Sequence, residues 1–153
     1  MAPPGRGCYD GQGLTTGLSA HSVKGSRVAT TEPSAPTLLV VEDNDVAREG
    51  LAVILRREGY RVDLAEHGEA ALRKLDKGPP PQLILLDMLM PVLDGWSFLQ
   101  QIRRRVPPST IPIIVTTGTI LTPEWASDHG CQGFVRKPIE PDALIAEIRR
   151  CLS

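Results

Sequence analysis

The chain has 153 residues, which is enough for one ordinary domain with a hydrophobic core and too few for two. Its formal net charge of −1 at pH 7 argues against a broad electrostatic attraction to nucleic acid or to a membrane surface. No apolar stretch approaches the roughly 18 residues of a membrane span, and the N-terminus lacks the apolar segment of a signal peptide, so we expect a cytoplasmic protein.

The first 36 residues differ in character from the rest of the chain. They are rich in Gly, Pro, Ser and Thr and contain almost no clustered aliphatic residues. Because such a segment cannot bury enough apolar surface to offset the entropy of ordering, residues 1–36 are predicted to be a disordered extension. The folded domain is predicted to span residues 37–153.

Two features that could indicate other functions have simpler explanations. Cys8, Cys131 and Cys151 form no C-x-x-C pair, which predicts a reducing compartment with no structural disulfide or zinc site. The basic run at 103–105 falls at the end of a predicted helix, where cations complement the helix dipole. This reading is favoured over a nucleic-acid patch.

From Thr37 onward, predicted strands alternate with amphipathic helices. The strands are expected at 37–43, 61–66, 83–86, 111–119 and 131–138, and the helices at 45–59, 68–78, 94–106, 121–130 and 140–152. The run Leu83–Leu86 is apolar throughout, as in parallel strands that are covered on both faces. Five β-α pairs predict an α/β fold, a doubly wound parallel sheet with right-handed crossovers.

Helix periodicity and end signals predict which side chains face the core and where helices stop. The expected core positions are Ala47, Leu51, Ile54 and Leu55, then Ala71, Leu72 and Leu75, then Phe98, Leu99, Ile102 and Val106, and last Leu144, Ile145, Ile148 and Leu152. Gly59 and Gly130 are expected to follow helix ends, while Thr122 and Pro123 are expected to start a short helix.

Polar residues stand where four of the five predicted strands end. They are Glu42 and Asp43, then Asp87, then Thr116 and Thr117, then Lys137. Taken singly, each has an ordinary explanation: a turn cap, a β-branched strand residue or a surface lysine. Because parallel strands end at the same edge of a sheet, where such folds carry their polar sites, the coincidence favours one shared site.

These residue types fit phosphoryl chemistry. Three carboxylates at one edge repel unless a cation lies among them, and oxygen ligands suit the hard ion Mg²⁺. An Asp in this setting can attack a phosphoryl group, which makes Asp87 a candidate nucleophile. Lys137 would neutralise charge on the phosphoryl oxygens, and Thr117 would donate a hydrogen bond to them.

The same residues carry a resemblance to a known family. The segments VVEDND, LLDMLMPVLDG, IPIIVTTG and GFVRKP occur in order within residues 37–153, and a D-x-x-M-P-x-x-D-G motif fits at Asp87, Met90, Pro91, Asp94 and Gly95. The chain therefore resembles the receiver domain of two-component response regulators, the CheY-like family. The resemblance implies a flavodoxin-like fold with a five-stranded parallel sheet in the order 2-1-3-4-5.

The resemblance also implies a role for each acidic residue. By motif position, Asp87 resembles the phosphoacceptor and Asp43 the direct Mg²⁺ ligand, with Glu42 acting through water. Leu89 would supply its backbone carbonyl to the ion.

On the other side of the site, Thr117 resembles the switch hydroxyl and Lys137 the lysine that pairs with the phosphoryl group. Phe134 resembles the aromatic residue whose rotamer follows the switch, although a Phe on a strand is usually a core residue. The family's Lys-Pro bond is cis, so Lys137–Pro138 is expected to be cis as well.

Two departures from the family pattern affect the loop after Thr117. Gly118 stands where the family usually has alanine, and the segment from Thr117 to Lys137 looks about two residues short. Leu89 and Thr119 occupy positions that, by the resemblance, influence how long the phosphoryl group survives, and neither carries an acid or amide to position water.

The leading interpretation is a stand-alone receiver. It would take a phosphoryl group from a histidine kinase or histidine phosphotransfer protein onto Asp87 and switch its protein contacts, without nucleic acid, membrane or turnover of external substrates. An alternative is a scaffold of receiver shape that needs no phosphate. A haloacid-dehalogenase-type phosphatase needs an acid where Leu89 stands, and a dinucleotide-binding domain needs a G-x-G-x-x-G segment after the first strand.

Overall fold

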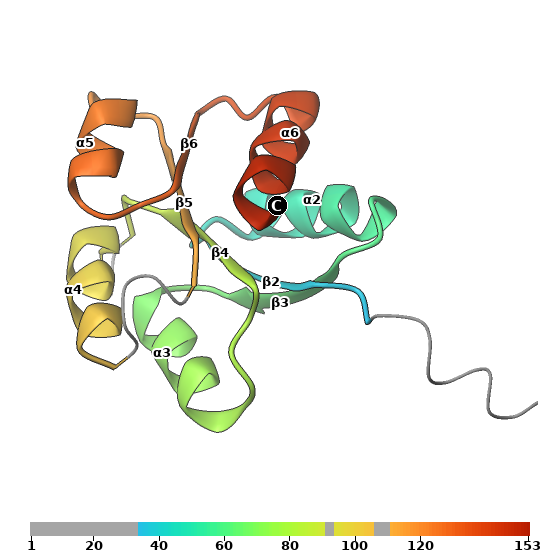
Figure 1. The fold of residues 1–153 in the computed structure, drawn as a ribbon, viewed down its shortest axis with the longest axis horizontal. Helices are drawn as coiled ribbons and strands as arrows, with labels where there is room; N and C mark the ends of the chain where they lie inside the picture. Colours follow the sequence, from blue (N-terminus) through green and yellow to red (C-terminus); the bar gives the residue numbers. More distant parts are fainter. Residues whose placement is uncertain (1–33, 91–93, 106–110) are drawn as a thin grey trace, which may run out of the picture. The chain divides into compact units, whose positions relative to one another are not determined.

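A computed structural model describes residues 34–90, 94–105 and 111–153. Its strands are β2 (Thr37–Val41), β3 (Arg61–Ala65), β4 (Leu83–Asp87), β5 (Ile113–Thr117) and β6 (Gly133–Arg136). Its helices are α2 (Asp45–Arg57), α3 (Gly68–Lys77), α4 (Gly95–Arg105), α5 (Pro123–Asp128) and α6 (Pro141–Leu152), and they alternate with the strands (Figure 1). Nearly all of the predicted extension, Pro91 of the motif and Val106 lie outside the described residues.

The five strands form one parallel sheet in the order β3-β2-β4-β5-β6. Counted along the chain, this is the order 2-1-3-4-5, so the predicted doubly wound α/β fold is confirmed. The register pairs Val41 with Leu86 and Asp87 with Thr116. The carboxyl ends of β2, β4 and β5 therefore meet at one edge of the sheet.

The sheet separates two hydrophobic cores. On β2, Leu39 and Val41 pack with α3, α4 and α5, whereas Leu38 and Val40 pack with α2 and α6. Figure 1 shows α2 and α6 next to each other, apart from α3, α4 and α5. Successive strand residues point to opposite faces, which is why continuous apolar runs such as Leu83–Leu86 are buried on both sides.

Most of the predicted core positions are buried, and the exceptions have a geometric reason. Leu51 and Leu55 of α2 are buried, as predicted, and so is Ala52, which was not predicted. Ala47 and Ile54 are only half-buried, because they border a groove that Ile139 also lines. Leu75 and Leu152 are half-buried on their helices, and the other predicted positions within the described residues are buried.

The predicted helix ends are confirmed. Gly59 and Gly130 follow α2 and α5 with φ of +95° and +79°, a region that favours glycine. Thr122 caps α5, its Oγ1 accepting a hydrogen bond of 3.1 Å from the N–H of Trp125. Helix α5 is six residues long, a short helix as predicted, and it lies within the expected range of 121–130. Of the helices in the described ranges, none has the length and apolarity to cross a membrane.

Candidate functional site

Three carboxylates meet at the carboxyl edge of the sheet. Glu42 directly follows β2 and Asp87 is the last residue of β4, and these strands are neighbours. One carboxylate oxygen from each of Glu42, Asp43 and Asp87 lies within 4.8 Å of the other two. Glu42 and Asp87 are 2% and 3% exposed, whereas Asp43 is exposed. The site is thus a buried acid pair with a third acid at its opening.

Lys137 reaches this cluster from the end of β6. Its Nζ lies 3.0 Å from Glu42 Oε1 and 3.4 Å from Asp87 Oδ1. The backbone that carries it is anchored by a 2.9 Å hydrogen bond from the Lys137 N–H to the Thr117 carbonyl, next to a cis Lys137–Pro138 bond, as predicted. Burial opposes the charge on Lys137, but its hydrogen bond to Glu42 and the nearby Asp87 raise its pKa above the usual value.

The pKa of the Asp87 carboxyl is raised by its surroundings. Burial raises its pKa from the ordinary 3.8 to about 6, the Leu89 N–H at 3.2 Å works in the opposite direction, and the charge of Glu42 adds to the increase. The hydrogen bond from Leu89 shows that Asp87 does cap the following turn. The turn cap and the strand-end acid of the site are therefore the same residue.

The two threonines at the end of β5 have different surroundings. The Thr116 hydroxyl donates to the Leu86 carbonyl at 3.4 Å, within the sheet. Thr117 is buried, and its Oγ1 lies 2.7 Å from Thr119 Oγ1 and accepts a 3.0 Å hydrogen bond from the Thr119 N–H. Among the described residues, no hydrogen bond joins Thr117 to Asp87. The predicted switch hydroxyl is therefore engaged by its own loop, and the residues of that loop that border the cavity above the acids are Gly118 and Thr119.

The cluster suits a hard divalent cation. A cavity of about 430 Å³ opens above the three acids and is also bordered by Leu89, Thr119 and Lys137. Its donors are carboxylate oxygens, without sulfur or imidazole, which is the ligand chemistry that Mg²⁺ prefers, and the cavity leaves room for waters. A cation bound there would offset the negative charges of the three carboxylates.

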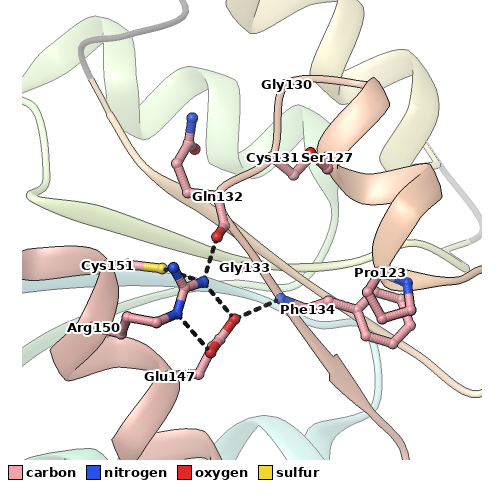
Figure 2. A pocket seen from close by; sticks show the side chains of 10 residues that line it. All are labelled: Pro123, Ser127, Gly130, Cys131, Gln132, Gly133, Phe134, Glu147, Arg150 and Cys151. Carbon is pink, nitrogen blue, oxygen red and sulfur yellow. Dashed lines mark hydrogen bonds and ion pairs between the residues drawn. The ribbon is translucent and has the colours of Figure 1, made fainter.

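A larger hollow lies on another surface, between α5, β6 and α6 (Figure 2). It measures about 600 Å³ and contains one carboxylate, Glu147, which is already paired with Arg150 at 2.8 Å. The hydrogen bond from Arg150 holds the pKa of Glu147 below its usual range. With Glu147 paired, this hollow offers no unpaired carboxylate among its lining residues, unlike the acid cluster.

Phe134 borders this hollow and is half-buried on β6. Its N–H donates to Glu147 Oε2 at 3.1 Å (Figure 2). The ring also packs against the core cluster of α3, α4 and α5. The Phe134 side chain is therefore intermediate in burial, with contacts to the core on one side and the hollow on the other.

The family model of the response regulator receiver domain matches residues 38–149. The chain belongs to the response regulator receiver family. Receiver domains are signalling domains, not turnover enzymes. They bind Mg²⁺ at an acidic pocket and act with histidine kinases or phosphotransfer partners.

This receiver is similar to segments of longer curated proteins. The chain is 36% identical over 119 residues to the transcriptional regulatory protein AfsQ1 of Streptomyces coelicolor. The matched segment covers 76% of this chain and 51% of AfsQ1. The chain is 35% identical over 120 residues to the 3',5'-cyclic-nucleotide phosphodiesterase regA of Dictyostelium discoideum, again 76% of this chain but 15% of the relative. The chain thus spans about half or less of the curated relatives it matches.

Solved structures agree with the fold of this receiver. The chemotaxis protein CheY4 of Vibrio cholerae has a TM-score of 0.70 and 29% identity, covering 77% of this chain and 99% of that one. The signal receiver domain of a histidine kinase from Syntrophus aciditrophicus has a TM-score of 0.67 and 31% identity, covering 77% and 90%.

Sequence reasoning missed one contributor to the site's surroundings, Arg136. Its guanidinium donates to the Thr119 carbonyl at 2.8 Å and to the Leu121 carbonyl at 2.7 Å. The only signal in the sequence is a cation directly before Lys137 on an edge strand, which reads as an ordinary exposed arginine. The contact depends on where the β5–α5 loop lies, and no pattern of residues predicts that.

Replacing Gly118 with the alanine usual in the family is expected to stabilise this receiver by about 0.4–1 kcal/mol, because alanine reduces the freedom of the unfolded chain. A Cβ at Gly118 would have Lys137 Cβ as its nearest neighbour, at an ordinary 3.7 Å. Urea unfolding of wild type and Gly118→Ala measures the difference. A lower midpoint for the variant would show that the loop needs glycine.

Proposed function

We propose that this receiver accepts a phosphoryl group on Asp87 from the phosphohistidine of a histidine kinase or histidine phosphotransfer protein, and that the modification changes its protein contacts. The observation that carries the proposal is the position of Asp87, held between a second buried acid and the Lys137 ammonium. With a pKa of about 6, Asp87 is largely ionised at neutral pH and available as a nucleophile.

The transfer requires few groups from the protein. An Asp87 oxygen forms the new bond to phosphorus, and the bond to the donor nitrogen breaks, its electron pair leaving with the imidazole. Glu42, Asp43 and Asp87, with the Leu89 carbonyl, would hold Mg²⁺, which supplies positive charge for the phosphoryl oxygens. Lys137 already lies 3.4 Å from Asp87 Oδ1, where it would neutralise a further phosphoryl oxygen.

The response to modification would begin at Thr117. A phosphoryl group on Asp87 offers acceptor oxygens, so the Thr117 hydroxyl would leave Thr119 and donate to the new group. Phe134, on the neighbouring strand, would adjust to that movement and alter the surface around it. The downstream partner is proposed to be a protein that reads this surface.

The segment before residue 37 is proposed to be an extension outside the receiver, in keeping with a family match that begins at residue 38. The cytoplasm is the proposed location, supported by Cys131 and Cys151, which are both free.

The direct test of this function is reaction with acetyl phosphate in the presence of Mg²⁺, followed by intact mass. Wild type is expected to gain the mass of one phosphoryl group, and Asp87→Asn is expected to gain none, because an amide oxygen is not a nucleophile of comparable strength. Asp94→Asn, a change at an exposed acid that caps α4, is the matched control and should react like wild type.

Loss of the reaction in EDTA is also expected. Equal modification of wild type and Asp87→Asn would contradict the assignment of Asp87. No modification of folded wild type, with no binding of the phosphoryl mimic beryllofluoride, would instead favour the scaffold that needs no phosphate.

A further inference from the structure

The loop between β5 and α5 is held from outside the site by one side chain. Arg136 Nη1 donates to the Thr119 carbonyl at 2.8 Å, and Nη2 donates to the Leu121 carbonyl at 2.7 Å. The guanidinium also lies over the Phe134 ring, 5.1 Å from its centre. A planar fork can bind two carbonyls at once, which an ammonium group cannot do in the same way.

The clamped loop is the one that engages Thr117. The Thr119 N–H donates to Thr117 Oγ1 at 3.0 Å, the two hydroxyls lie 2.7 Å apart, and the Leu121 N–H donates to Thr119 Oγ1 at 3.4 Å. Thr117 cannot move toward a phosphoryl group on Asp87 without lengthening its contacts with the Thr119 N–H and the Thr119 hydroxyl. Movement of Thr117 therefore requires Thr119 to move or to lose these contacts, and the Thr119 carbonyl is held by Arg136.

Arg136 is separate from the acid cluster. It is exposed, and it does not border the cavity above Glu42, Asp43 and Asp87. Its neighbour Lys137 borders that cavity, consistent with the alternation of side chains along a strand. A change at Arg136 should therefore leave the metal ligands in place.

We propose that Arg136 is a positioning residue that acts as a latch, holding the β5–α5 loop in the unphosphorylated arrangement through the carbonyls of Thr119 and Leu121. The inference rests on the proposed function and names a regulator of the same site. By stabilising the arrangement in which Thr117 is bonded to Thr119, the latch opposes the phosphorylated one. Phe134 lies beneath the guanidinium, so release of the latch would also free the predicted switch aromatic.

The test compares binding of beryllofluoride with binding of Mg²⁺ alone in wild type, Arg136→Ala and Arg136→Lys. Arg136→Ala is expected to bind beryllofluoride roughly three- to tenfold more tightly than wild type, the range expected for loss of hydrogen bonds from a charged donor at an exposed site. Its Mg²⁺ affinity without beryllofluoride should not change. Arg136→Lys keeps the charge but loses the fork, and should fall between the two.

Amide hydrogen exchange gives a readout that needs no phosphoryl mimic. In metal-free Arg136→Ala, the Thr119 and Leu121 amides are expected to exchange faster than in wild type, while amides of β2 stay unchanged. Arg57→Ala, at another exposed arginine at the end of α2, is the control and should match wild type in every measurement. If Arg136→Ala folds poorly, Arg136→Lys carries the same test.

The outcomes distinguish the Arg136 latch from the proposed role of Asp87 as phosphoacceptor. Equal or weaker beryllofluoride affinity in folded Arg136→Ala would overturn the latch and leave Asp87 as phosphoacceptor. A parallel change in Mg²⁺ affinity would also overturn it, because Arg136 would then support the acid cluster itself. Failure of wild type both to bind beryllofluoride and to react with acetyl phosphate would contradict the proposed function, and the latch with it.

Discussion

Replacing Asp87 with asparagine is expected to raise the free energy of unfolding of the metal-free protein by about 2–3 kcal/mol at about pH 7.5. The reason is that Asp87 is 3% exposed and lies beside Glu42, so its ionised form is disfavoured in the folded state. Asparagine has nearly the same shape and carries no charge. A residue proposed to be indispensable for function would thus be unfavourable for folding.

The expected pH dependence follows from the direction of the shift. The folded-state pKa of Asp87, about 6, is above the ordinary 3.8, so the folded protein binds a proton that the unfolded chain releases. The stability that this proton contributes is fully present below about pH 4 and is lost as the pH rises through about 6. Wild type should approach Asp87→Asn in stability at the acid end and fall below it toward neutral pH.

The measurement is urea unfolding of both proteins in EDTA across this pH range, with Asp63→Asn, at an exposed position on β3, as the control. The difference between wild type and Asp87→Asn should grow with pH, whereas Asp63→Asn should follow wild type. Parallel profiles for wild type and Asp87→Asn would contradict the effect of burial on Asp87. Added Mg²⁺ should stabilise wild type more than Asp87→Asn, because ligand binding to the folded state adds stability.

Gly95→Ala is expected to destabilise the protein by about 2–3 kcal/mol, as inserting a methyl group into a tightly packed place does. A Cβ at Gly95 would lie 2.7 Å from Met88 Cα and 3.0 Å from the Asp87 carbonyl oxygen. Both are backbone atoms of the segment that carries the phosphoacceptor, and they cannot move aside as a flexible side chain could. The start of α4 or the Asp87 segment must shift.

A matched control distinguishes this clash from a general effect of alanine. Gly50 lies exposed in the middle of α2, and a Cβ there meets no atom within 4 Å. Gly50→Ala should therefore stabilise the protein by about 0.5–1 kcal/mol, from helix propensity alone. Urea unfolding compares the two variants, and beryllofluoride binding should weaken for Gly95→Ala. Unchanged stability in Gly95→Ala would show that α4 can move without loss.

The D-G pair of the family motif thus has a physical explanation. The Asp94 side chain caps α4 by accepting a 2.8 Å hydrogen bond from the Ser97 N–H, and Gly95 lets the helix begin against the backbone of Met88. The motif sets the distance between α4 and the end of β4. The sequence pattern alone identifies the pair but not this contact.

The fold was predictable because each strand and helix carries a strong local signal. Leu83–Leu86 is apolar throughout, helix ends are marked by residues such as Gly59 and Thr122, and parallel strands must bring their carboxyl ends together. The same rule predicts that Glu42 and Asp87 meet. Residue type and strand position therefore predict which groups meet.

What could not be predicted depends on distances between segments that sequence spacing does not define. The hydrogen bonds of Thr117 to Thr119, and of Arg136 to the loop, require the loop's path in space. Ala47 likewise borders a groove together with Ile139 of the β6–α6 connection, a neighbour from a distant segment that helix periodicity does not predict. Side chains whose partners lie in loops are the ones that local pattern fails to place.

The hydrogen bond from the Phe134 N–H to Glu147 has a consequence for association between molecules. Strand β6 is the edge of the sheet, and an edge strand with free N–H groups can pair with a strand from another chain, which leads to aggregation. Here the Glu147 carboxylate takes the Phe134 N–H, and Arg150 in turn binds both Glu147 and the Gln132 carbonyl. Charged side chains of α6 thereby occupy backbone groups at the start of β6. Because these groups are occupied, a strand from another molecule cannot pair with them.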